Sequence, residues 1–196
     1  SDLSYVYAPL LLSHEKIIIT NSQKKRSAVD TRYHERRAQC AEALKELQTV
    51  IAIRDLGELT AEVFEKVQEM IASPVRVCRA RHAVTENQRT IQAVEALKHG
   101  DLFEFGQLMN ASHLSLKEDY EVSCEELDIL VEEAWNIDGV LGSRMMGAGF
   151  GGCTVSIVEN SAVNSFIQKV GENYQSRTGL QAEFYVVETG NGATVL

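Results

Sequence analysis

The chain has 196 residues, of which 44% are hydrophobic and 24% charged, an ordinary composition for a globular protein. Nineteen basic and 28 acidic residues give a formal charge of −9, which repels polyphosphate backbones and argues against nucleic acid as a main partner. We expect no membrane span and no signal peptide, because no apolar run approaches the ~18–20 residues that cross a bilayer. The four cysteines stand far apart without a CxxC pair, which predicts reduced cytoplasmic thiols and neither a disulfide framework nor a metal site.

The first predicted elements are strands over Leu3–Leu12 and Lys16–Thr20. The second strand ends in a β-branched run, which is typical of a strand buried on both faces. Three cations follow it, Lys24, Lys25 and Arg26. They form either a solvated turn or a basic site that attracts phosphate.

Helical periodicity predicts the middle of the chain. The expected helices are Thr31–Leu47, Thr60–Ile71, Val75–Leu97, Asp101–Leu116 with Asp101 as N-cap, and a helix that runs from a capping box at Ser123-x-x-Glu126 to Asn136. The last segment is predicted as a strand (Cys153–Val158), a helix (Ser161–Gln175) and a strand (Ala182–Glu188). The result is an α/β fold of the α+β type, with an antiparallel sheet of about four strands packed against helices.

Glycine is densest at Gly147-Ala148-Gly149-Phe150-Gly151-Gly152, hereafter the glycine loop. Each glycine costs roughly 0.5–1 kcal/mol in a helix or strand interior, so this run predicts a shaped loop. Gly147, Gly149 and Gly152 fit the pattern G-x-G-x-x-G, but the order around them is helix then strand, the reverse of a dinucleotide site. We therefore exclude a nicotinamide or flavin site. The glycines either let an anion or backbone approach closely or only allow close packing.

Five stretches in register resemble the C-terminal half of galactokinases, which belong to the galacto-, homoserine, mevalonate and phosphomevalonate kinase superfamily. They are Thr20–Ser22 with Ser27 and Tyr33–Cys40, then Arg79–Asn87, Met109–His113, Asp119–Ser123, and Leu141–Met146 with the glycine loop. The resemblance covers nearly all of residues 1–196 and implies one domain, the ferredoxin-like C-terminal kinase domain. Within it, residues 1–12 are expected to be the last strand of a missing N-terminal domain.

The resemblance implies transfer of the γ-phosphoryl group of ATP to the C1 hydroxyl of D-galactose, with Mg²⁺ assisting. The family's catalytic aspartate, phosphate loop and principal sugar-binding segment lie in its N-terminal half. No catalytic residue and no metal ligand is therefore expected in this chain, which we expect to be inactive alone and to bind no cofactor tightly.

Position by position, the resemblance assigns Tyr33 to contact with galactose, although its place on the apolar stripe of a helix also fits a core residue. It puts the glycine loop, from Gly147 to Gly152, on the active-site floor between two halves of the enzyme. It puts Lys24, Lys25 and Arg26 near the nucleotide. The arginines and histidines of the helices, which are Arg36, Arg37, Arg79, Arg81, His82 and His113, are expected to hold helices together.

Three possibilities stay open from the sequence. The parent protein is either a catalytic galactokinase, a sugar and ATP sensor without turnover, or a sister kinase for a sugar such as N-acetylgalactosamine. The partners expected are D-galactose, ATP and the missing N-terminal half. Without that half, the face with Tyr33 and the glycine loop is expected to expose apolar surface and to favour self-association.

Overall fold

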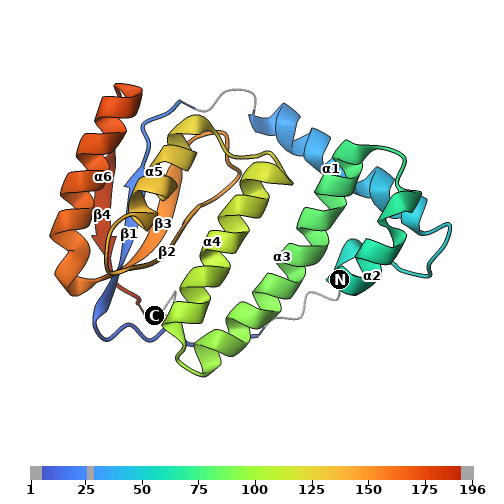
Figure 1. Ribbon diagram of the computed structural model, residues 1–196, viewed down its shortest axis with the longest axis horizontal. Coiled ribbons are helices and arrows are strands. Elements are labelled where there is room, and N and C mark those ends of the chain that lie inside the picture. Colours follow the sequence, from blue (N-terminus) through green and yellow to red (C-terminus); the bar gives the residue numbers. More distant parts are fainter. Residues whose placement is uncertain (1–5, 26–28, 191–196) are drawn as a thin grey trace, which may run out of the picture.

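The structure is a computed structural model that describes residues 6–25 and 29–190. This part of the chain forms a four-stranded sheet and six α-helices (Figure 1). The elements are β1 (Glu15–Asn21), α1 (Val29–Leu47), α2 (Ala61–Val67), α3 (Pro74–Lys98), α4 (Leu102–Glu118), α5 (Glu125–Trp135), β2 (Val140–Met145), β3 (Cys153–Glu159), α6 (Val163–Thr178) and β4 (Glu183–Val187). Short 3₁₀ turns lie at Leu56–Glu58, Gln68–Met70 and Asn160–Ala162.

The strands lie in the order β2-β3-β1-β4, and every neighbouring pair is antiparallel. Helices α1 to α5 fill the connection from β1 to β2, and α6 fills the connection from β3 to β4. This is the βαββαβ order of a ferredoxin-like domain with a large helical insertion. The predicted fold, an antiparallel sheet of four strands packed against helices, is confirmed.

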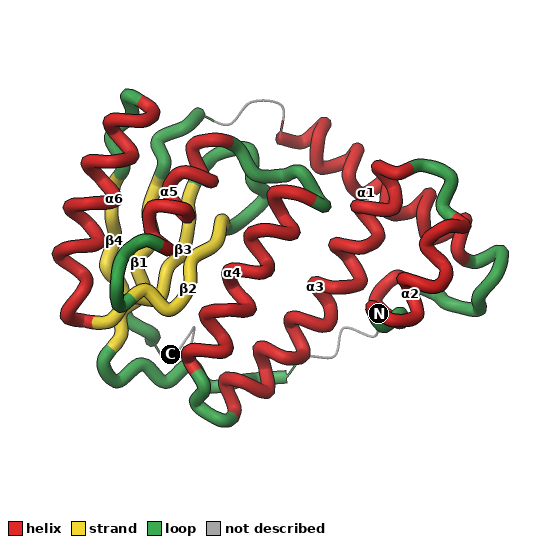
Figure 2. Tube along the Cα trace, in the orientation of Figure 1, coloured by secondary structure: helices red, strands yellow, loops and turns green. Residues whose placement is uncertain are grey.

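Helices α5 and α6 cover one face of the sheet (Figures 1 and 2). Ile18 of β1 and Val158 of β3 are fully buried there, packed with Phe166 and Val170 of α6. The buried Tyr174 ties α6 to the chain after β1, because its hydroxyl donates a hydrogen bond of 2.6 Å to the carbonyl of Ser22. This core fixes β1, and with it the segment that follows β1, relative to the sheet.

Helix α4 packs closely on the edge strand β2, beside the sheet in Figure 2. The backbones touch at Gly106 and Gly142: a Cβ atom on Gly106 would lie 2.1 Å from the carbonyl oxygen of Leu141. The helix thereby protects an edge that would otherwise offer unpaired backbone groups. The sequence did not predict β2, because glycine and arginine interrupt its apolar pattern and its place depends on this contact with α4.

A second core joins α1, α2 and α3 at the other end of the molecule (Figure 1). Ala43 and Leu47 of α1, Phe64 of α2, and Ala80 and Val84 of α3 are buried in it. Helix α3 contacts both α1 and α4, so this 25-residue helix connects the two cores.

Several local predictions need correction. Residues 6–12, the described part of the predicted strand Leu3–Leu12, have no regular secondary structure. The helix predicted over Thr60–Ile71 is α2 followed by a 3₁₀ turn. Ser123 is not the N-cap of α5: that position is Cys124, and the Ser123 hydroxyl donates to Asp128 instead. The N-cap at Asp101 is confirmed, since its side chain accepts from the amide of Glu104.

Candidate functional site

The glycine loop connects β2 to β3 as the turn of a hairpin. Gly147, Gly149, Gly151 and Gly152 have φ of 76°, 82°, 120° and 90°, a region that other residues adopt at a cost. Phe150 also has a positive φ, 58°. The predicted shaped loop is confirmed, but it follows a strand and not a helix. It also precedes a strand, so it lacks the helix N-terminus of a dinucleotide site.

The inner side of the glycine loop is anchored on residue Val122. A Cβ on Gly149 would lie only 2.0 Å from the carbonyl oxygen of Val122, and the amide of Phe150 donates to that same oxygen at 2.8 Å. The ring of Phe150 is buried with Met145 and Leu127. Close packing is therefore one reason for the glycines, as the packing interpretation required.

The N-terminal part of α1 lies against the glycine loop. The guanidinium carbon of Arg32 is 5.1 Å from the ring centroid of Phe150, a cation–π distance. The next residue, Tyr33, is 48% exposed, so it is not a core residue. Its ring meets His34 edge-on at 5.9 Å between centroids. The structure thus places Tyr33 next to a residue that contacts the glycine loop, with the Tyr33 ring half exposed to solvent.

An arginine clamp, made of Arg36, Arg79 and Arg81, holds residues 119–121, which directly precede the anchor at Val122. Arg36 donates to the carbonyl of Tyr120 at 2.8 Å and to that of Glu121 at 3.2 Å. Arg79 donates to the carbonyl of Asp119 and pairs with the Glu121 carboxylate, while Arg81 lies 3.4 Å from the Asp119 carboxylate. These side chains join helices, as the sequence predicted.

The basic segment after β1 runs beside the glycine loop. A Cβ on Gly151 would lie 3.0 Å from the carbonyl oxygen of Lys24, so the two backbones are neighbours. The ammonium of Lys24 pairs with the carboxylate of Glu126, and this hydrogen bond raises the pKa of Lys24. Lys25 is exposed, and Arg26 lies outside the described residues. Lys24 therefore lies near the loop with its charge already partnered within the chain.

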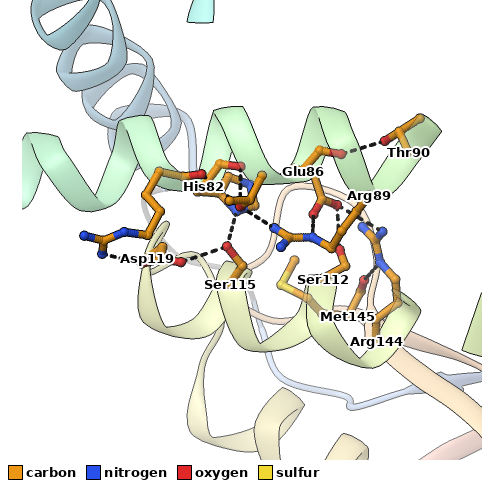
Figure 3. Close-up of polar contacts among 11 residues, drawn as sticks. His82, Glu86, Arg89, Thr90, Ser112, Ser115, Asp119, Arg144 and Met145 are labelled. Atoms are coloured by element: carbon orange, nitrogen blue, oxygen red, sulfur yellow. Dashed lines mark hydrogen bonds and ion pairs between the residues drawn. The ribbon is translucent and has the colours of Figure 1, made fainter. Parts of the chain in front are cut away.

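A partly buried charged cluster, which was not predicted, joins side chains of three elements (Figure 3). The carboxylate of Glu86 accepts from Ser112 at 2.6 Å and from Arg89 at 2.7 Å, and lies 3.5 Å from Arg144. Arg144 also donates to the carbonyl of Met145, at 3.1 Å. The cluster joins α3, α4 and β2, and Arg144 lies three residues before the start of the glycine loop. No sequence signal placed these four residues together, because they come from three separate segments.

Two buried histidines make contacts within the protein. His82 meets the hydroxyl of Ser115 at 2.9 Å and stacks on Tyr120, with 4.5 Å between ring centroids. Burial lowers the pKa of His82 to about 4. The amide of Met145 donates to Nδ1 of His113, so the proton is on Nε2, which lies 3.4 Å from the carboxylate of Asp128. Both histidines hold helices in place, as expected.

A cavity of about 320 Å³ opens on the far side of the charged cluster. Its walls are mostly apolar and come from the segment before β1, from α3 and α4, and from the sheet. Glu86, Arg89 and Arg144 contribute the charged part of the lining, and Met146 and Gly147 bring the start of the glycine loop to its edge. The cavity is therefore continuous with the back of the loop.

The sequence and the fold both match known kinases. The family described as GHMP kinases C terminal matches residues 93–176, which include α4, α5, the hairpin with the glycine loop, and most of α6. A solved galactokinase from Lactococcus lactis, complexed with galactose, superposes with a TM-score of 0.95 at 46% identity, covering 100% of this chain and 50% of that one. The mevalonate kinase of L. major shares the fold, with a TM-score of 0.54 at 20% identity.

Curated relatives agree over nearly the whole sequence. The galactokinase of Fusobacterium nucleatum is 54% identical over 192 residues, which are 97% of this chain and 49% of the relative. That of Enterococcus faecalis is 49% identical over 196 residues, 100% of this chain and 51% of the relative. The chain thus spans about half the length of the curated relatives it matches.

Residues 93–176 match the C-terminal domain of the GHMP kinases, and they include helices α4 and α5 and the glycine hairpin described above. Within that class, the chain is the C-terminal half of galactokinase-like proteins. The resemblance read from the five sequence stretches is confirmed.

Two kinds of feature are absent from residues 6–25 and 29–190. None of the helices there has the length and apolarity needed to traverse a bilayer. Within the same ranges, no three His, Cys, Asp or Glu side chains are grouped so that they offer a metal site.

Proposed function

We propose that this chain is the C-terminal domain of a galactokinase, which transfers the γ-phosphoryl group of ATP to the C1 hydroxyl of D-galactose. The observation that carries the proposal is the 46–54% identity to galactokinases over essentially the whole chain. The anchored glycine loop beside Tyr33 supports it, because that arrangement offers a fixed wall with an exposed phenol.

In this proposal, the chain forms one wall of the active site and does not contribute the catalytic groups. Phosphoryl transfer requires aligned reactants, neutralised phosphate charge and a group that orients or deprotonates the attacking hydroxyl. The resemblance puts the catalytic aspartate and the phosphate loop in the half that precedes this one. We expect ATP and D-galactose to bind between the halves, and residues 1–12 to complete the upstream domain.

Magnesium does not fit the described residues alone, because they offer no cluster of oxygen ligands. In our proposal, Mg²⁺ assists the reaction in the full-length parent, held by groups outside the described residues and by the phosphates of ATP. We place the protein in the cytoplasm, because its four cysteines are free thiols, as is usual in a reducing compartment.

Tyr33 is proposed to hydrogen-bond galactose. Tyr33 is half exposed and follows Arg32, which contacts Phe150 of the glycine loop, and a phenol offers a sugar both an apolar face and a polar tip. In the full-length protein, Tyr33→Phe should raise the KM for galactose about fivefold and leave the KM for ATP unchanged, since one neutral hydrogen bond contributes about 1 kcal/mol. Tyr185→Phe is the matched control: Tyr185 is equally exposed, but its hydroxyl donates to Glu183.

The test of the function is ATP-dependent phosphorylation of galactose by the isolated chain and by the full-length protein. We expect turnover only with the longer protein. Robust turnover by the isolated chain would mean that the catalytic residues have been misplaced. A longer protein that binds both ligands without turnover would be a sensor, and one that prefers N-acetylgalactosamine would be a sister kinase.

A further inference from the structure

The two faces of the sheet are covered very differently. Ile18 and Val158 face α5 and α6 and are fully buried. Their neighbours Ile17, Val155 and Ile157 have the opposite orientation and line the cavity described above. Among the described residues, this second face is closed only partly, by side chains of α3 and α4 and by Leu10. An apolar hollow of about 320 Å³ is thus left on the sheet.

The charged edge of this hollow is incompletely neutralised. Glu86 brings one negative charge, whereas Arg89 and Arg144 bring two positive charges. The Glu86 carboxylate already accepts short hydrogen bonds from Arg89 and Ser112, so Arg144 has only a 3.5 Å contact with it. Burial lowers the pKa of Arg144 despite the nearby carboxylate. A further acceptor at this point would be favoured, because the Arg144 guanidinium is only one-third exposed and a partly buried charge is stabilised by a close partner.

We propose that the cavity is the docking site of an apolar segment from the upstream half of the longer protein, and that this segment carries an acidic side chain that pairs with Arg144. The inference rests on the proposed function, which makes this chain the second half of a protein about twice as long. Leu10, in the segment through which the upstream half is joined, forms part of the cavity wall. The occupant is therefore covalently tethered beside the cavity and has a high effective concentration there.

The docking also has a consequence for the active site. Arg144 donates to the carbonyl of Met145, and Met146 and Gly147 lie on the cavity edge. An acidic side chain that holds Arg144 would fix the start of the glycine loop from behind. Assembly of the two halves and the position of the loop would then depend on the same guanidinium.

Protection of a cysteine at the cavity in the full-length protein tests the proposal. Thr90 lines the cavity and is exposed in this chain, and Thr49, which follows the end of α1 and does not line the cavity, is also exposed. Each hydroxyl donates to a nearby helical carbonyl, at 2.9 Å for Thr90 and 2.7 Å for Thr49. Thr49→Cys is thus a matched control for Thr90→Cys, and the parent protein measures the background from its native cysteines.

In the native full-length protein, a maleimide should label the Thr90→Cys variant at least ~30-fold more slowly than the Thr49→Cys variant, and equally fast in urea. Labelling rates within threefold of each other in the native state would overturn the proposal. A photoreactive benzophenone residue at position 90 should cross-link to a peptide from the upstream half of the same chain. A cross-link to a second copy, or protection that is lost on dialysis because a small molecule filled the cavity, would also overturn it.

The acidic partner is tested by Arg144→Lys with a carbodiimide, which joins an amine to a nearby carboxylate with loss of water. We expect an amide bond to an Asp or Glu of the upstream half, and a bond to Glu86 alone would refute the charge pairing.

Phosphorylation of galactose is measured separately on the parent. An active parent with a freely labelled position 90 would refute the docking alone, and an inactive parent with a protected position 90 would refute the function alone.

Discussion

Gly149 offers the sharpest test of how the glycine loop is built. Its φ is +82°, and a Cβ there would lie 2.0 Å from the carbonyl oxygen of Val122 and 2.9 Å from the carbonyl carbon. Real Cβ atoms do not approach backbone this closely, so Gly149→Ala must push the loop away from its anchor. The same movement breaks the 2.8 Å hydrogen bond from the Phe150 amide to Val122.

Three contributions set the expected magnitude. Forcing alanine into the left-handed region costs about 1 kcal/mol, overpacking about 1–3 kcal/mol, and the lost hydrogen bond about 1 kcal/mol. Gly149→Ala should therefore lower the free energy of unfolding by about 3–5 kcal/mol. Gly100→Ala is the matched control, because Gly100 has a φ of +69° but nothing within 4 Å of a Cβ, so only the first cost of about 1 kcal/mol applies.

The assay is urea unfolding of the 196-residue chain, followed by circular dichroism and by the fluorescence of its single tryptophan, Trp135. With a urea slope of about 1–3 kcal/mol per molar, the Gly149→Ala midpoint should be roughly 1–3 M below that of Gly100→Ala. Midpoints within about 0.5 M of each other would show that the contact with Val122 is not what requires glycine at this position.

Three further predictions concern the frame around the loop. Gly106→Ala should destabilise the chain by about 1–3 kcal/mol although alanine favours helices, because its Cβ would lie 2.1 Å from the carbonyl oxygen of Leu141. The control Gly171→Ala should change stability by less than about 1 kcal/mol in the same urea assay, because the nearest atom there is a Phe184 ring carbon at 3.3 Å. The pKa of His82 is about 4 in the folded state and 6.5 in the unfolded chain, so the free energy of unfolding must fall as the pH drops from 6.5 towards 4. Between pH 7 and 5 the loss due to His82 should be about 2 kcal/mol, and an unchanged pH dependence of stability in the His82→Asn variant would contradict this. Arg79→Met should cost about 3 kcal/mol, since it removes a buried guanidinium that pairs with the Asp119 carbonyl and the Glu121 carboxylate. Arg54→Ala removes an exposed ion pair and should cost less than about 1 kcal/mol, so equal midpoints for the two variants would refute the clamp.

The sequence predicted most of the fold because local patterns specify it. The long helices have clear apolar periodicity, and β1 and β3 are β-branched strands. By contrast, β2 was missed: its Gly142 weakens the strand pattern, and the glycine is there because α4 comes into backbone contact. The side-chain hydroxyl of Ser123 was assigned to a helix cap, but it bonds Asp128. In both cases a tertiary contact decided what local preference left open.

The sequence pointed to individual residues of the candidate site but not to the contacts between them. The glycine loop is the shaped loop that its composition predicted, and the resemblance singled out Tyr33, whose helical stripe alone suggested a core position. Tyr33 lies on the same helical stripe as the buried Arg36, Ala43 and Leu47, but it is near the N-terminal end of α1 and is 48% exposed. The contact between Arg32 and Phe150, residues 118 positions apart in the sequence, follows from the packing of α1 and carries no sequence pattern.

The arginine clamp has a consequence for binding. Because Arg36 comes from α1 and Arg79 and Arg81 from α3, two helices grip the short stretch on which the glycine loop rests. A ligand that meets this wall finds it already ordered and loses little of its affinity to immobilising loose chain. Selectivity would then come from shape that exists before the ligand arrives, and evolution of a new ligand preference would have to act on the side chains that project from the wall rather than on its rigidity.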